Sequence, residues 1–204
     1  MKHYILLFSI AILIFSCGGE GKSSKANHAK EAAAATEEGK ILWLDIEEIE
    51  ERMKKEPKKV LVDGYTTWCG WCKRMDKATF AQPDIVKKVN EEFYAFKFNC
   101  ERKDTINFKG QEFTFKKSGR KGYNTLAPIL LKGKLSYPTI SFLDEELNLI
   151  DAYPGAKTAD KFDGMLTYVN ENHYKAGNLQ TFLAGYKTDV PAVPLVPKKT
   201  AIKK

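Results

Sequence analysis

The sequence predicts one α/β domain, over residues 40–175, and three observations support this prediction. Short apolar segments typical of strands alternate with amphipathic segments typical of helices. One strand segment, 60–65, leads directly into a helix that begins at a pair of cysteines, Cys69 and Cys72. The 204 residues are 43% hydrophobic and 12% aromatic, which is enough for one packed core with non-globular ends.

The order of the elements follows from the apolar pattern. Ile46, Ile49 and Met53 recur at helical spacing, and this helix ends before Pro57 because a residue that precedes a proline avoids the helical conformation. The apolar run at 60–65 is typical of a buried central strand. Further strands are predicted at 41–43, 93–98, 139–143 and 147–153, and further helices after Cys69, after Pro83 and over 157–169.

Residues 101–136 form an insertion before the last two strands. The segment 108–115 is predicted to be a hairpin with its turn at Lys109-Gly110. A helix is predicted over 123–131. Its inward-facing residues are expected to be Leu126, Ile129 and Leu130.

Residues 1–16 have the pattern of a signal peptide. A short basic start precedes a largely apolar run, 5–15, which is too short to span a bilayer. The run ends in Ile14-Phe15-Ser16-Cys17, which resembles the lipobox of bacterial lipoproteins, although that family usually has Leu where Ile14 stands. The resemblance implies that Cys17 is acylated and anchors the chain in a membrane. The alternative interpretation is an ordinary secretion signal with an incidental cysteine.

Residues 17–39 are predicted to be the lipidated cysteine and a flexible tether. This segment is rich in Gly, Ser, Lys, Ala and Glu and has no apolar pattern to bury. Gly18, rather than Asp, follows the cysteine, and this resembles lipoproteins that move on to the outer membrane. The predicted location is therefore the cell envelope, with the chain lipid-anchored, facing the periplasm, at the outer membrane.

The net charge of +7 lies mostly outside the predicted domain. Lys2 contributes one positive charge, residues 187–204 contribute four net charges and residues 18–40 are balanced, so about +2 remains on 41–186. This charge is too small for a phosphate-binding face, and nucleic-acid binding is rejected. Prolines and lysines near the end of the extension 176–204 predict a disordered, polyproline-like tail.

The strongest chemical signal is Trp68-Cys69-Gly70-Trp71-Cys72 at a junction between a strand and a helix. Two residues between the thiols allow the pair to interconvert between dithiol and disulfide without a change of fold. At a helix N-terminus, unpaired N–H groups and the helix dipole favour the thiolate of Cys69, so this sulfur is the predicted nucleophile. Cys72, one turn further, suits the resolving role.

Other interpretations of the cysteines stay open at this point. A pair of cysteines is also half of a zinc site, but the remaining candidates, Cys100 and His173, are unpaired in the sequence. A static structural disulfide is possible outside the cytoplasm. Cys100 is most simply a buried apolar thiol, and a third redox thiol is the alternative.

The domain resembles the thioredoxin superfamily, and more closely its bacterial periplasmic members with a Trp-Cys-Gly-Trp-Cys-Lys site and an insertion before the proline loop. The resemblance covers about residues 40–172 and implies a central mixed sheet flanked by helices. It also implies that Asp63 is a buried carboxylate that deprotonates the resolving cysteine through water. Desolvation would raise the pKa of such an acid, and the alternative for Asp63 is a polar strand residue with a local hydrogen bond. Lys97 matches the lysine beside that carboxylate, although a surface lysine is the alternative.

The same resemblance predicts the surface that binds substrate. Tyr137-Pro138-Thr139 matches the loop opposite the cysteines, where the family has a cis proline and offers backbone groups to an extended chain. Gly155 matches a later glycine that allows a partner chain to approach. With these, the residues expected to contact substrate are Trp68, Gly70 and Trp71.

The predicted function is a thiol–disulfide oxidoreductase that needs no cofactor or metal. Asp63 favours a reductant of exported proteins, fed by a membrane electron-transfer reductase, and a monomer is expected. The Gly-Trp pair between the cysteines leaves the direction of electron flow open. The alternatives are a disulfide isomerase or oxidase on the same fold and, from another class, a redox-inactive binding module or metallochaperone.

Overall fold

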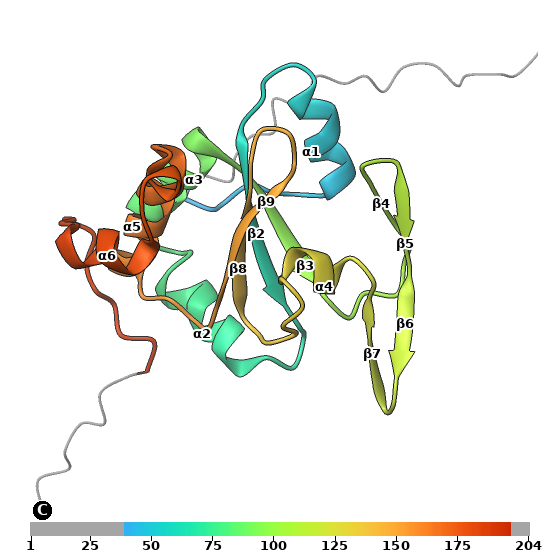
Figure 1. Cartoon of the computed structure of the whole chain (residues 1–204). Coiled ribbons are helices and arrows are strands. Elements are labelled where there is room, and N and C mark those ends of the chain that lie inside the picture. Colours follow the sequence, from blue (N-terminus) through green and yellow to red (C-terminus); the bar gives the residue numbers. More distant parts are fainter. Residues whose placement is uncertain (1–38, 197–204) are drawn as a thin grey trace, which may run out of the picture. The chain divides into compact units, whose positions relative to one another are not determined.

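The computed structural model describes residues 39–196, and within them a mixed five-stranded sheet forms the centre of the domain (Figure 1). The strand order is β1-β3-β2-β8-β9. Strands β1, β3 and β2 are parallel, whereas β8 runs antiparallel to β2, and β9 runs antiparallel to β8. The bounds are β1 Trp43–Leu44, β2 Lys59–Tyr65, β3 Phe93–Asn99, β8 Thr139–Leu143 and β9 Leu149–Pro154. The predicted α/β class with a central mixed sheet is therefore confirmed.

The predictions for residues 1–38 and 197–204 lie outside the described residues. These are the signal peptide, the lipidated Cys17, most of the tether and the end of the tail. Among residues 39–196, no helix has the length and apolar character that a membrane crossing requires.

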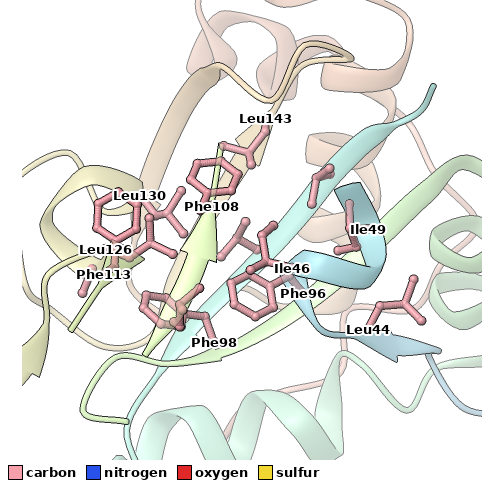
Figure 2. Packing of buried hydrophobic residues seen from close by; sticks show 14 of the residues in the cluster. Leu44, Ile46, Ile49, Phe96, Phe98, Phe108, Phe113, Leu126, Leu130 and Leu143 are labelled. Atoms are coloured by element: carbon pink, nitrogen blue, oxygen red, sulfur yellow. The ribbon is translucent and has the colours of Figure 1, made fainter. Parts of the chain in front are cut away.

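The sheet has a separate apolar core on each face because successive residues of a strand point to opposite sides. In β2, Val60 and Val62 belong to one core and Leu61 to the other. The first core includes helix α1 (Ile46–Met53), and Figure 2 shows its Ile46 and Ile49 beside Phe96 of β3. The second core contains residues of three other helices, α2 (Gly70–Ala78), α3 (Pro83–Glu92) and α5 (Ala159–Asn170).

The insertion begins with the predicted hairpin. Strands β4 (Ile106–Phe108) and β5 (Gln111–Phe113) pair antiparallel around a turn at Lys109 and Gly110, where both residues have positive φ, so this prediction is confirmed. Ile106, Phe108 and Phe113 are buried in the first core, and Figure 2 shows the two phenylalanines beside Leu126 and Leu130. The hairpin therefore completes one face of the domain.

A second hairpin follows, in place of part of the predicted helix. Strands β6 (Phe115–Ser118) and β7 (Lys121–Asn124) pair antiparallel, and only α4 (Ala127–Leu130) is helical, so the helix predicted over 123–131 is wrong in its first half. The buried Asn124 side chain explains the difference. Its Oδ1 accepts from the Leu126 N–H and its Nδ2 donates to the Phe113 carbonyl of β5 and to the Asp104 carbonyl in the loop before β4. Ile129, expected to face inward, is 49% exposed.

The chain beyond α5 packs back onto this helix, which the sequence did not predict. A 3₁₀ turn (His173–Lys175) and helix α6 (Leu179–Gly185) follow α5. Gly164 of α5 allows the close crossing, because a Cβ at this position would lie 2.5 Å from Cδ2 of Leu183. The buried Asp163 carboxylate accepts hydrogen bonds from Lys88 Nζ at 2.7 Å, the Tyr186 hydroxyl at 2.7 Å and the Thr188 hydroxyl at 2.6 Å.

Asp163→Asn is expected to lower the free energy of unfolding by about 3 kcal/mol at neutral pH, because it breaks a buried ion pair. Burial opposes ionisation, but hydrogen bonds from Lys88, Thr188 and Tyr186 outweigh it and lower the pKa of the Asp163 carboxyl below 3.8. The stabilisation is therefore present above pH 3.8 and is lost as the pH falls through the folded pKa. Urea unfolding at neutral and acidic pH measures both effects.

Asp151→Asn is the matched control. Asp151 pairs with Lys132, whose side chain is largely exposed, and such pairs contribute less than about 1 kcal/mol. An Asp163→Asn variant as stable as this control would show that the cluster around Asp163 does not hold the extension on α5.

Candidate active site around Cys69 and Cys72

The two cysteines lie where the central strand β2 ends and α2 begins. The Cys69 N–H donates to the Thr66 carbonyl at 3.1 Å, which turns the chain from the strand into the helix. Cys69 occupies the N-cap position, and its Sγ accepts a hydrogen bond from the Cys72 N–H at 3.1 Å. The sulfurs form a disulfide, with the Cα atoms 5.4 Å apart. In the reduced protein, the same N–H groups and the helix dipole would stabilise a thiolate on Cys69.

Two exposed tryptophans flank the buried disulfide. Cys69 and Cys72 are each 3% exposed, whereas Trp68 is 54% and Trp71 is 48% exposed. Arg74 lies over the Trp71 ring, 4.5 Å from its centroid. The motif therefore presents exposed aromatic side chains next to a recessed sulfur pair. A Cβ on Gly70 would meet no atom within 4 Å, so the surface is open at this residue.

The proline loop lies beside this surface. The Tyr137–Pro138 bond is cis, and the Pro138 carbonyl accepts from the Gly155 N–H at 2.8 Å. Gly155 has a φ of +86°, a conformation that other residues rarely adopt. A hollow of about 270 Å³ is lined by Trp71, Tyr137, Pro138, Gly155, Ala156 and Leu195. The structure thus brings four of the predicted substrate-contact residues to one hollow, together with Leu195 from the C-terminal extension. The other three, Trp68, Gly70 and Thr139, do not line it.

Thr139 has a structural position at the start of β8. It pairs in register with Gly64 of β2, and its hydroxyl donates to the Ser136 carbonyl at 2.7 Å. A Cβ on Gly64 would lie 3.2 Å from the Thr139 carbonyl oxygen, so the glycine allows the proline loop to lie close to the central strand. The Thr139 side chain is fully buried.

Asp63 lies in β2, inside the domain, in contact with Lys97 of β3. Asp63 is 1% exposed, and its Oδ2 accepts from Lys97 Nζ at 2.8 Å. Lys97 also donates to Asp76 of α2 at 2.6 Å, so one ammonium bridges two carboxylates. The second oxygen of Asp63, Oδ1, is buried and has no hydrogen-bond partner among the described residues. It is an acceptor available to a proton or a water molecule.

These contacts perturb both ionisable groups. Burial raises the pKa of the Asp63 carboxyl, and its attraction to Lys97 and hydrogen bond from Lys97 offset only part of this effect. Burial lowers the pKa of Lys97, but Asp63 and Asp76 together raise it above its ordinary value. Asp63 is thus a buried acid with a raised pKa, as the family resemblance implies, and such a shift brings the pKa of a carboxyl closer to neutral pH.

Asp76 and Glu101 belong to the site but were not singled out from the sequence. Asp76 lies four residues after Cys72 on the same helix, and this spacing is the signal that places it on the same face. Glu101 accepts from Trp68 Nε1 at 2.9 Å and comes from the insertion, for which the sequence carries no comparable signal. The interpretation of Lys97 as a surface lysine does not fit its contacts with the two carboxylates.

Cys100 is a free thiol in the first core. It is fully buried, and its Sγ donates to the Phe98 carbonyl at 3.7 Å. Burial raises the pKa of this thiol, with the charges of Asp63 and Glu101 adding to the effect. The Cys100 thiol is therefore expected to be unreactive in the folded protein. In residues 39–196, no three side chains of the metal-ligating types come together as a zinc site requires.

The fold and the site together define the class of this protein. It is an α/β protein with a disulfide at the start of the helix that follows its central strand. A family model for a thioredoxin-like domain matches residues 46–170, which include the pair, Asp63, Lys97 and the proline loop. The chain belongs to this thioredoxin-like family.

Solved structures with a similar fold come from several organisms. A thioredoxin-fold protein from Helicobacter pylori is 18% identical, with 63% of this chain and 83% of that chain covered and a TM-score of 0.46. A thioredoxin from Thermus thermophilus is 16% identical, with 63% and 86% covered and a TM-score of 0.47. A DsbH oxidoreductase is 13% identical, with 74% and 95% covered and a TM-score of 0.46. No curated protein sequence matches the chain significantly.

Asp63→Asn is expected to raise the free energy of unfolding at neutral pH by roughly 1–3 kcal/mol, because it removes a buried charge with an unpaired oxygen. Since the folded pKa is raised, ionisation of Asp63 destabilises the fold increasingly as the pH rises from 3.8 through the folded pKa. Urea unfolding from acidic to neutral pH should show that the variant becomes more stable than the wild-type protein over this range. Asp76→Asn is the control. Because the Asp76 side chain is 40% exposed, this variant should change the free energy of unfolding by less than about 1 kcal/mol. A less stable Asp63→Asn would mean that the attraction of Lys97 outweighs burial.

Proposed function

We propose that this protein is a thiol–disulfide oxidoreductase that reduces disulfides of exported proteins. The observation that carries the proposal is the position of the cysteine pair. Cys69 is the N-cap of α2, recessed between two exposed tryptophans, and a buried acid with a raised pKa lies in the strand that leads to it. A merely structural disulfide requires neither the exposed aromatic surface nor the buried carboxylate.

The proposed reaction has two exchange steps. The Cys69 thiolate attacks one sulfur of the substrate disulfide, the substrate S–S bond breaks, and a mixed disulfide forms while the departing sulfur leaves as a thiolate and takes up a proton. Cys72 then loses its proton to Asp63 through water and attacks Sγ of Cys69. This step releases the second substrate thiol and forms the Cys69–Cys72 disulfide. Two electrons have passed to the substrate, and a dithiol donor must return them before the next cycle.

The proposed cellular setting rests on the sequence. The segment that ends at Cys17 supports a lipid anchor in the cell envelope, facing the periplasm and at the outer membrane. A chain placed there would receive electrons from a membrane electron-transfer reductase and act as a monomer on exported protein disulfides. Disulfide substrates are abundant in this compartment, which also supports the proposal.

The direction of electron flow is set by the reduction potential of the Cys69–Cys72 pair. Equilibration in dithiothreitol or glutathione buffers measures it on the purified chain. A reduction potential of about −270 mV supports a reductant, and one of about −120 mV would make the protein an oxidant. A pair that never titrates reversibly would make the disulfide structural.

Cys69→Ser is expected to abolish insulin reduction, because it removes the sulfur that the N-terminus of α2 would stabilise as the attacking thiolate. Cys72→Ser is expected to accumulate mixed disulfides with substrate, because the resolving attack is lost. Reduction assays and non-reducing gels measure the two outcomes. Activity that survives in Cys69→Ser would contradict the proposed nucleophile.

Cys100→Ala provides the thiol control. Since Cys100 is fully buried and has a raised pKa, the variant should keep full insulin reduction. In the reduced wild-type protein, iodoacetamide should alkylate Cys69 first and leave Cys100 unmodified until the protein unfolds. Mass spectrometry of the tryptic peptides distinguishes the two sites, and early labelling of Cys100 would show that it is a third reactive thiol.

A further inference from the structure

The second hairpin of the insertion carries a dense cluster of positive charge. Lys116, Lys117, Arg120 and Lys121 are all exposed, and residues 113–124 contain no Asp or Glu. We call these four residues the basic cluster. Because residues 41–186 together carry only about +2, the rest of that segment has a slight negative charge. The positive charge of the domain is thus concentrated on one hairpin.

The fold does not need these charges. Backbone pairing of β6 with β7 holds the hairpin, in the register Lys116↔Tyr123, Lys117↔Gly122 and Ser118↔Lys121. The Phe115 ring packs against Gly122, where a Cβ would lie 2.2 Å from Cζ of the ring. Among the described residues, no member of the basic cluster forms an ion pair. Four neighbouring like charges without ion-pair partners repel one another, so their charge does not stabilise the hairpin.

The basic cluster adjoins the cysteine motif through Lys121. Lys121 Nζ is 3.8 Å from the centroid of the Trp68 ring, and Trp68 precedes Cys69. A hollow of about 300 Å³ opens between them, lined by residues of the hairpin, Leu135, Trp68, Glu101 and Tyr137. Glu101 is the acidic residue in this lining, and its Oε2 already accepts from Trp68 Nε1.

Tyr137 connects this hollow to the one at the proline loop. It lines both hollows, and its ring meets Trp68 edge to face at 5.9 Å between centroids. A polypeptide that lies against Gly155 and Pro138 with its disulfide at Cys69 can continue past Tyr137. Beyond Tyr137, the next segment of the substrate polypeptide would lie against the hairpin and its exposed cations.

We propose that the basic cluster binds an acidic segment next to the disulfide of the substrate protein, so that the enzyme prefers acidic substrates. This rests on the proposed thiol–disulfide exchange at Cys69. Charge complementarity supports the occupant, because Lys121 lines the hollow beside Trp68 and three further exposed cations lie on the same short hairpin. The nearby rings of Trp68 and Tyr137 offer an apolar stacking surface. Such steering acts mainly on the rate of association and weakens with salt.

The test compares two peptide disulfides that differ only in an adjacent run of Asp and Glu, replaced by Asn and Gln in the second peptide. The triple variant Lys116→Gln/Lys117→Gln/Arg120→Gln is expected to lower kcat/KM for the acidic peptide about 10-fold at low salt. It should leave the neutral peptide unchanged, and about 0.5 M salt should abolish the wild-type preference. Lys121 is kept because it contacts Trp68.

Lys54→Gln/Lys55→Gln/Lys58→Gln is the matched control. It removes the same charge from residues before the first residue of β2, at the opposite end of this strand from the cysteines. Equal losses in the control and the hairpin variant would overturn the proposal, since net charge alone would then explain them. Equal loss for both peptides, or no preference in the wild-type protein, would also overturn it.

A binding assay separates this proposal from the proposed reaction. The acidic peptide with its cysteines replaced by serine should bind the wild-type chain, measured by fluorescence anisotropy, and lose affinity in the hairpin variant. Binding of this peptide without any turnover of either disulfide peptide would refute the exchange reaction alone. Cosedimentation with anionic vesicles that depends on the hairpin, with no peptide preference, would assign the cluster to a membrane surface and overturn the proposal.

Discussion

The central strand β2 hydrogen-bonds to a neighbour on each side, and this double pairing determines where the chemistry of the protein lies. Its partners β3 and β8 fix its position, so the chain leaves the sheet at one defined point after Tyr65. The turn through Thr66 then starts α2 at Cys69. The N-terminus of α2 is thereby held beside the proline loop, because Gly64 and Thr139 are register partners across the β2–β8 pair. A loose central strand would separate the sulfurs from the loop.

Two buried aspartates of this domain show opposite solutions to the cost of burying a charge. Asp163 accepts three side-chain hydrogen bonds that outweigh burial and hold its pKa low, so the ionised form stabilises the fold. Asp63 shares its one ammonium with Asp76 and keeps an unpaired oxygen, so burial dominates and its pKa is raised. The first arrangement suits a structural anchor. The second retains an acid that can still exchange a proton, at a cost in stability that is typical of functional sites.

The elements that the sequence predicts well are those whose pattern is local. Val60, Leu61 and Val62 are consecutive apolar residues because β2 is covered on both faces, and Lys109-Gly110 supplies the turn of the first hairpin. The second hairpin and α6 depend on distant partners. Asn124 ends β7 through carbonyls of other segments, and the crossing of α6 over α5 at Gly164 depends on the absence of a side chain. Neither contact leaves a periodic signal in its own segment.

The residues of the candidate site also differ in whether a local sequence pattern predicts them. The cysteine motif and the proline loop have short signatures, and Asp63 has a fixed spacing from Cys69, so a family resemblance is enough to select them. Asp76 and Glu101 become parts of the site only through contacts with Lys97 and Trp68. The basic cluster is hidden in the sequence for another reason. The balanced charge of residues 41–186 averages over surfaces that the fold separates, and only the structure shows which cations share a hairpin.

The two hollows beside the cysteine pair are bounded by parts of the chain with different origins. Helix α2, which follows the central strand, supplies the sulfurs, and the segments next to β8 and β9 supply the proline loop and Gly155. The proposed exchange reaction uses these parts. The insertion and the C-terminal extension also line the hollows. Leu195 of the extension lines the hollow at the proline loop, and the second hairpin of the insertion lines the hollow beside Trp68. Neither Leu195 nor the second hairpin bonds to the sulfurs or to Asp63, whose contacts come from α2 and β3. In the proposed reaction, the insertion and the extension are therefore the parts placed to select the substrate, while the cysteine pair carries out the exchange.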